Sequence, residues 1–154
     1  MKTQRKVIIL YVILGVLLLF IWGNSMLPVA QSAAESRTIG KIITPFLELF
    51  VGQGNVTDHL VRKLAHFCEF GALGLTLGLI LLTKRQRNSF HISYMIFCGL
   101  AVAVADESIQ LISAGRGAQI QDVLLDTAGV FFGLFVVVVL FYLIRKDDKS
   151  KKNK

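Results

Sequence analysis

The chain has 154 residues, of which 54% are hydrophobic and only 18% are charged. Ordinary soluble domains carry about 25% charged residues, so this composition excludes that class and indicates an integral membrane protein. The formal net charge of +7 then reflects membrane topology and attraction to anionic inner-leaflet lipid, and not nucleic-acid binding.

Four apolar segments follow one another along the chain. A helix needs about 20 apolar residues to cross a hydrocarbon core about 30 Å thick, and each segment reaches or approaches that length. The predicted spans are residues 7–23, 60–83, 91–112 and 123–144. The sequence therefore predicts an all-α, integral membrane four-helix bundle that forms a single domain over residues 1–154.

Residues 1–32 allow a second interpretation, a cleavable signal peptide with a small-residue site at Ala30-Gln31-Ser32. Its apolar stretch is longer than such peptides usually have, and the candidate site lies far beyond that stretch. These lengths favour an uncleaved first span.

A long loop joins the first two spans, and Pro28 should end the first helix. Within the loop, residues 36–52 place apolar side chains close to a helical stripe. This pattern predicts a short amphipathic helix on the outer membrane interface or over the mouth of the bundle, with a packing role. Pro45 should interrupt the helix or divide it into two pieces.

The distribution of basic residues predicts the orientation. Most of the 17 Lys and Arg residues fall before the first span, between the second and third spans, or in the tail, residues 145–154. Because Lys and Arg in short flanking segments resist translocation, both termini are predicted to be cytoplasmic, with a basic cytoplasmic tail and an extracellular first loop.

Ionisable residues lie at a similar depth in three of the predicted spans. Inserting one charged side chain at the centre of a membrane helix costs at least about 2.5 kcal/mol. In the second span, Arg62, His66 and Glu69 share one helical face, and Lys63 lies at its margin. This topology places these side chains in the outer half of the bundle.

The third and fourth spans carry matching stripes. Asp106 and Gln110 continue a stripe of small residues in the third span, whereas Glu107 lies about 100° away and should meet a different neighbour. In the fourth span, Asp122 and Asp126 precede two glycines that should permit close helix approach. Together with Arg116 in the joining turn, the second, third and fourth spans predict one outward-facing polar pocket. Its expected residues are Arg62, Lys63, His66, Glu69, Asp106, Glu107, Gln110, Arg116, Asp122 and Asp126.

Four motifs in order, RKLAHFCEFGALG, DESIQ, GR and DVLLDTAG, resemble the VanZ-like membrane proteins. The resemblance covers about residues 61–133, and the NSMLPVAQSAAES segment is similar to the first loop of that family. Two positions depart from the family pattern: Ala114 stands where Pro is usual, and Asp126 where Asn is common. The resemblance implies an envelope protein associated with resistance to the glycopeptide antibiotic teicoplanin, with no established reaction.

Three functions remain open for the predicted pocket. In the first, Arg62, Lys63 and Arg116 bind the phosphate or carboxylate headgroup of an anionic lipid or lipid-linked cell-wall precursor. In the second, the protein is an enzyme in which a divalent metal or a histidine base acts on an envelope lipid. The candidate catalytic residues are His66, Glu69, Asp106 and Glu107. In the third, the charged groups only fasten the helices. The sequence predicts no particular oligomeric state.

Overall fold

A computed structural model of the chain describes residues 2–84, 88–115, 117 and 119–152, and in this described part every regular element is a helix. The helices are α1 (Lys2–Ser25), α2 (Val29–Val51), α3 (Asp58–Thr83), α4 (Ser89–Ile112) and α5 (Ile120–Lys152). α1, α3, α4 and α5 are each long and apolar enough to cross a membrane, so the four predicted apolar helices are confirmed.

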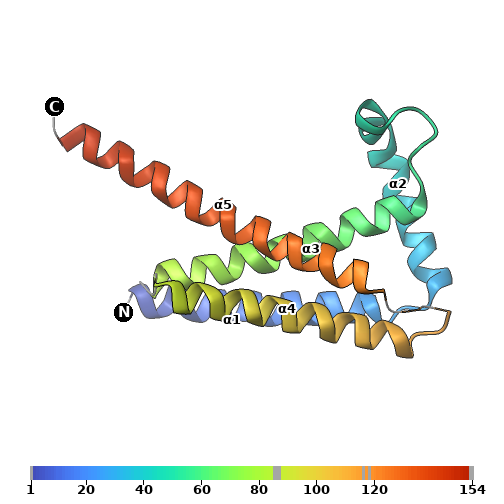
Figure 1. Cartoon of the computed structure of the whole chain (residues 1–154), viewed down its shortest axis with the longest axis horizontal. Helices are drawn as coiled ribbons and strands as arrows, with labels where there is room; N and C mark the ends of the chain where they lie inside the picture. The colour runs from blue at the N-terminus through green and yellow to red at the C-terminus, as the bar shows by residue number, and fades with distance from the viewer. Residues whose placement is uncertain (1, 85–87, 116, 118, 153–154) are drawn as a thin grey trace.

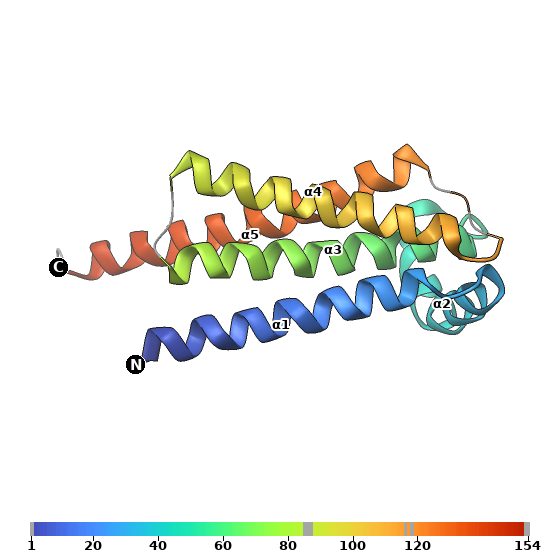
Figure 2. The same ribbon diagram turned by 90° about the horizontal axis from the view of Figure 1, so that it is seen from below.

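The four long helices lie roughly side by side in a bundle (Figure 2). Their outward faces carry large apolar side chains such as Leu19, Phe97 and Phe135, while Asp106 and Asp126 are buried. A soluble protein would lose stability from such an arrangement, but lipid tails satisfy the apolar faces and cannot satisfy a carboxylate. The distribution of side chains is therefore that of a helical bundle in a bilayer.

Glycines bring α3 and α5 into the most extensive helix contact of the described chain, where the two helices cross (Figure 1). A Cβ atom built on Gly133 would lie 2.1 Å from the backbone oxygen of Gly71, and one on Gly74 would lie 2.2 Å from that of Val130. No larger side chain fits at either position without moving a backbone. The prediction that glycines in the last span permit close approach is confirmed.

The α2 helix differs from its prediction in length. It is one continuous helix of 23 residues that passes through Pro45, not a short or divided one. Pro45 is exposed, so the carbonyl that loses its helical donor there is not shut away from other partners. The buried face carries the small residues Ser32, Ser36 and Gly40, whereas most of the apolar stripe is exposed. In a membrane protein small residues allow close packing and exposed apolar ones can meet lipid, which fits a helix on the outer membrane interface, one of the two expected positions.

The start of α1 and the end of α5 lie at one end of the bundle, and α2 lies across the other (Figures 1 and 2). We call these the terminal end and the α2 end. The α5 helix continues to Lys152, so much of the basic segment predicted as a tail, residues 145–154, is helical. Neither Gly nor Pro occurs between Arg145 and Lys152 to stop the helix.

Candidate functional site

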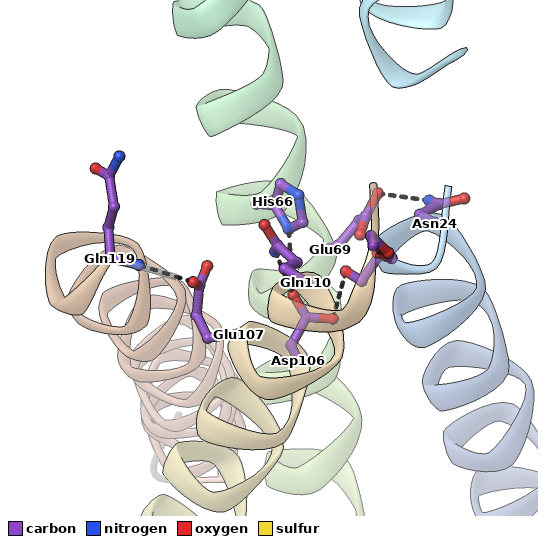
Figure 3. A network of polar contacts seen from close by, with 9 residues as sticks. Asn24, His66, Glu69, Asp106, Glu107, Gln110 and Gln119 are labelled. Atoms are coloured by element: carbon purple, nitrogen blue, oxygen red, sulfur yellow. Dashed lines mark hydrogen bonds and ion pairs between the residues drawn. The ribbon is translucent and has the colours of Figure 1, made fainter. Parts of the chain in front are cut away.

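Asp106, near the last turns of α4, is the centre of a buried polar network at the α2 end. Its side chain is 0% exposed. The Ser25 hydroxyl donates a hydrogen bond of 2.6 Å to Oδ1, and Gln110 Nε2 donates one of 2.9 Å to Oδ2. His66 Nδ1 lies 3.9 Å from the same Oδ2 (Figure 3). Three helices thus converge on a single carboxylate, which is an expensive group to bury without such partners.

Local sequence explains how these donors reach Asp106. Gln110 follows Asp106 by four residues, so both side chains lie on one face of α4, as predicted. Ser25 is the last residue of α1, and the Ser113 hydroxyl donates a hydrogen bond of 2.8 Å to its backbone oxygen. Because that oxygen belongs to the end of α1, where helical partners are missing, this contact also fastens α4 to α1.

Glu69 belongs to the same helical face as His66 but approaches a different partner. Asn24 Nδ2 donates a hydrogen bond of 3.0 Å to Glu69 Oε1, on the side of the cluster formed by α1 (Figure 3). The polar face of α3 therefore contacts two helices: His66 lies near Asp106 of α4, and Glu69 accepts a hydrogen bond from α1.

A small pocket lies between α3, α4 and α5, beside the Asp106 network. Its volume is about 10 Å³, which is room for one water-sized ligand or ion. Seven of the ten residues expected to form a polar pocket line it: Arg62, Lys63, His66, Glu107, Gln110, Asp122 and Asp126. Leu125 completes the lining. Asp106 and Glu69 lie in the adjoining network, and Arg116 is outside the described residues.

The two cations that line the pocket have partners on neighbouring turns or helices. Lys63 Nζ forms an ion pair of 2.9 Å with Asp122 Oδ1, which joins α3 to the first turn of α5. Arg62 Nη2 lies 3.1 Å from His59 Nδ1. Both cations are only partly buried, so a ligand can reach them without first entering the bundle.

Glu107 confirms the expectation that it faces a neighbour different from that of Asp106. It is buried, and its Oε2 accepts a hydrogen bond of 3.0 Å from the backbone N–H of Gln119, just before α5 (Figure 3). This contact places a second carboxylate on the flank of α4 that faces the start of α5, and it holds the turn that leads into α5.

Asp126 is the least compensated acid of the site. It is 1% exposed, and within the described part of the chain neither of its carboxylate oxygens has a hydrogen-bond partner. One ligand atom from each of His66, Asp106 and Asp126 lies within 4.8 Å of the others. A buried carboxylate in this position requires a proton or a bound cation to offset its charge.

Sequence reasoning missed the contributions of Asn24 and Ser25. Both were assigned to the polar start of the loop, yet they end or nearly end α1 and bond to acids on α3 and α4. The available signal was two polar residues directly after an apolar span. Helical periodicity says nothing about which neighbouring helix such a terminal side chain reaches.

No curated protein and no solved structure matches this sequence significantly. The profile of the VanZ/LLP1 family matches residues 8–143, which include all of the pocket residues and most of the four apolar helices. The chain is therefore a member of the VanZ/LLP1 family of membrane proteins.

Proposed function

We propose that this protein binds the phosphate-bearing headgroup of an anionic envelope lipid or a lipid-linked cell-wall precursor at the outer edge of the pocket between α3, α4 and α5, where Arg62 and Lys63 are partly exposed. The observation that carries the proposal is the placement of Arg62 and Lys63, two partly buried cations on successive residues that line the same pocket. Arg offers a planar pair of donors to a phosphate, and Lys adds a compact charge.

The distribution of basic residues supports an outward-facing pocket. The start of α1 and the end of α5 both lie at the terminal end of the bundle (Figure 2). The Lys- and Arg-rich segments next to these helix ends are therefore at the terminal end as well. If the positive-inside bias sets the topology, both termini are cytoplasmic and the α2 end faces the outside. Headgroups of the outer leaflet then lie at the depth of the pocket.

The Lys63–Asp122 ion pair suggests how a phosphate group would bind, by exchange of one anionic partner for another. At 2.9 Å the two groups hold each other at the edge of the pocket, each about a quarter exposed. An incoming phosphate oxygen can replace the Asp122 carboxylate as the partner of Lys63, because both are anionic acceptors. Arg62, on the neighbouring residue, can then donate to a second phosphate oxygen.

The proposal also gives the family association with teicoplanin a chemical basis. Glycopeptides act on wall precursors outside the membrane, and a protein that holds such a lipid-linked precursor at its headgroup alters what the drug meets. Under this proposal, resistance is a consequence of headgroup binding and needs no chemical change of the antibiotic.

The test is the lipid that remains with the purified protein. The protein is extracted in mild detergent, and retained lipid is identified and counted by mass spectrometry. We expect an anionic phosphate lipid near one per chain, reduced roughly tenfold when Arg62→Gln and Lys63→Gln are combined, because charge-assisted hydrogen bonds are lost. The matched control, Arg37→Gln with Lys84→Gln, removes one Arg and one Lys outside the pocket and should retain the lipid. Equal retention by both double variants would contradict the proposal.

A further inference from the structure

Asp126 raises a question that headgroup binding does not answer. The five acids of the site, Glu69, Asp106, Glu107, Asp122 and Asp126, outnumber Arg62 and Lys63, the two described bases that line the pocket. Asp122 is paired with Lys63, and Glu69, Asp106 and Glu107 accept hydrogen bonds. Asp126 is buried at 1% exposure and has no described hydrogen-bond donor to either oxygen.

We propose that His66, Asp106 and Asp126 bind a divalent transition-metal cation, such as Zn²⁺ or Mn²⁺, at the floor of the pocket. Each residue offers one ligand atom, and the three atoms lie within 4.8 Å of one another. Ligands of a tetrahedral metal bound at about 2.0–2.2 Å lie roughly 3.4 Å apart, so side-chain movements of about 1 Å close the set around an ion. Imidazole together with carboxylates favours these metals over Mg²⁺ and Ca²⁺, which prefer oxygen ligands alone.

The hydrogen bonds to Asp106 provide the outer support that metal sites require. Ser25 holds Oδ1 and Gln110 holds Oδ2, so the carboxylate is fixed in place before any ion binds. Each carboxylate oxygen has two lone pairs and retains the capacity to ligate after accepting one hydrogen bond. Ligating carboxylates in proteins are commonly held in this way by neighbouring donors.

The position of the pocket leaves a coordination site open. His66, Asp106 and Asp126 supply three ligands, and the pocket of about 10 Å³ that His66 and Asp126 help to line has room for one small ligand. Three protein ligands with an open position are typical of metal sites that bind or activate an oxygen atom. Bound there, the cation would offset the Asp126 charge and present an electrophile toward the pocket.

This inference does not depend on headgroup binding, because all three ligands belong to the protein. Its test uses the full-length protein in detergent after removal of metal with a chelator and without added lipid. Isothermal titration with Zn²⁺ and then Mn²⁺ should give one site per chain. Asp126→Asn, which preserves volume but removes the charge, should weaken the affinity at least tenfold, as should His66→Gln. Asp58→Asn, an exposed carboxylate outside the pocket, should bind as the wild type does.

Three results would overturn the inference: no metal bound by the wild-type protein at millimolar concentration, binding unchanged by both pocket variants, or equal weakening in Asp58→Asn. If a pocket variant fails to fold, X-ray absorption of Zn²⁺ on the wild-type protein decides the question. One imidazole with oxygen ligands is expected, and a spectrum without imidazole contradicts the site. Retained lipid, measured separately, reports on headgroup binding whatever the metal result.

Discussion

Two cavities between the same three helices differ in almost every property. The pocket at the α2 end has a volume of about 10 Å³ and is lined by charged and polar side chains except for Leu125. The cavity toward the terminal end is about 160 Å³ and is lined by Gly78, five aliphatic side chains and Phe141. Between them, glycines hold α3 and α5 in contact. The same helices therefore form an apolar, loosely filled half and a tight polar half.

The difference shows that close helix packing and buried polar groups are concentrated in different parts of this bundle. Where α3 meets α5, backbone atoms approach so closely that only glycine fits, and dispersion contacts stabilise the pair. At the α2 end, buried acids replace that packing with hydrogen bonds and ion pairs. Burying polar groups in a membrane costs free energy. A functional role would explain why they are concentrated in one half of the bundle, whereas helix packing alone would not.

The largest expected effect comes from Gly133→Leu, which attacks the contact that both halves share. The new side chain would meet the Gly71 oxygen, which is 2.1 Å from the position of a Cβ atom. We expect a loss of at least ~3 kcal/mol of stability or failure to fold. The measurement is the yield of monodisperse protein in detergent and its thermal midpoint. Gly15→Leu is the control, because no atom lies within 4 Å of a Cβ atom there; equal behaviour of the two variants would show that the α3–α5 contact is not needed.

An intermediate effect is expected from Ser25→Ala, which damages only the polar half. Asp106 would lose the donor to Oδ1 while it stays buried, at a cost of about 1–3 kcal/mol. Thermal unfolding in detergent measures this loss. Ser108→Ala is the matched control, since that exposed hydroxyl donates a hydrogen bond to the Val104 oxygen of its own helix. A shift in Ser25→Ala no larger than in Ser108→Ala would mean that Asp106 does not depend on α1.

The smallest effect on stability is expected from Asp122→Asn at the edge of the pocket. Its ion pair with Lys63 is partly exposed, so its removal should change the free energy of unfolding by at most ~1 kcal/mol. The amount of retained phosphate lipid should rise, and it should change more than stability does, because Lys63 is released to bind an anionic partner. Comparing retained phosphate lipid with the thermal midpoint separates the two. A large loss of stability with unchanged lipid would identify the pair as a structural fastener.

Much of the bundle could be predicted from the sequence because membrane insertion imposes simple constraints. Span length follows from bilayer thickness, and the helical angle of 100° per residue places Asp106 and Gln110 on one face and Glu107 on another. The structure confirms each of these placements. Periodicity within one helix was sufficient for all of them.

The remainder depends on how helices face one another, which periodicity does not contain. The pairing of Ser25 with Asp106 could not be predicted, because a residue at a helix end can reach several neighbours. The small residues of α2 form its buried face and most of its large apolar side chains are exposed, which periodicity alone does not decide. The sequence predicts Asp126 as one of several acids in the pocket. The structure adds that neither of its oxygens has a hydrogen-bond donor among the described residues.

The central claim is that the polar half binds a phosphate headgroup through Arg62 and Lys63, and native mass spectrometry tests it most directly. The protein is titrated in detergent with a polyprenyl phosphate and, in parallel, with the polyprenol of the same length. We predict at least roughly tenfold tighter binding of the phosphate, a preference that disappears when Arg62→Gln and Lys63→Gln are combined. Equal affinity for the two lipids, or a phosphate preference that the double variant retains, would contradict the account.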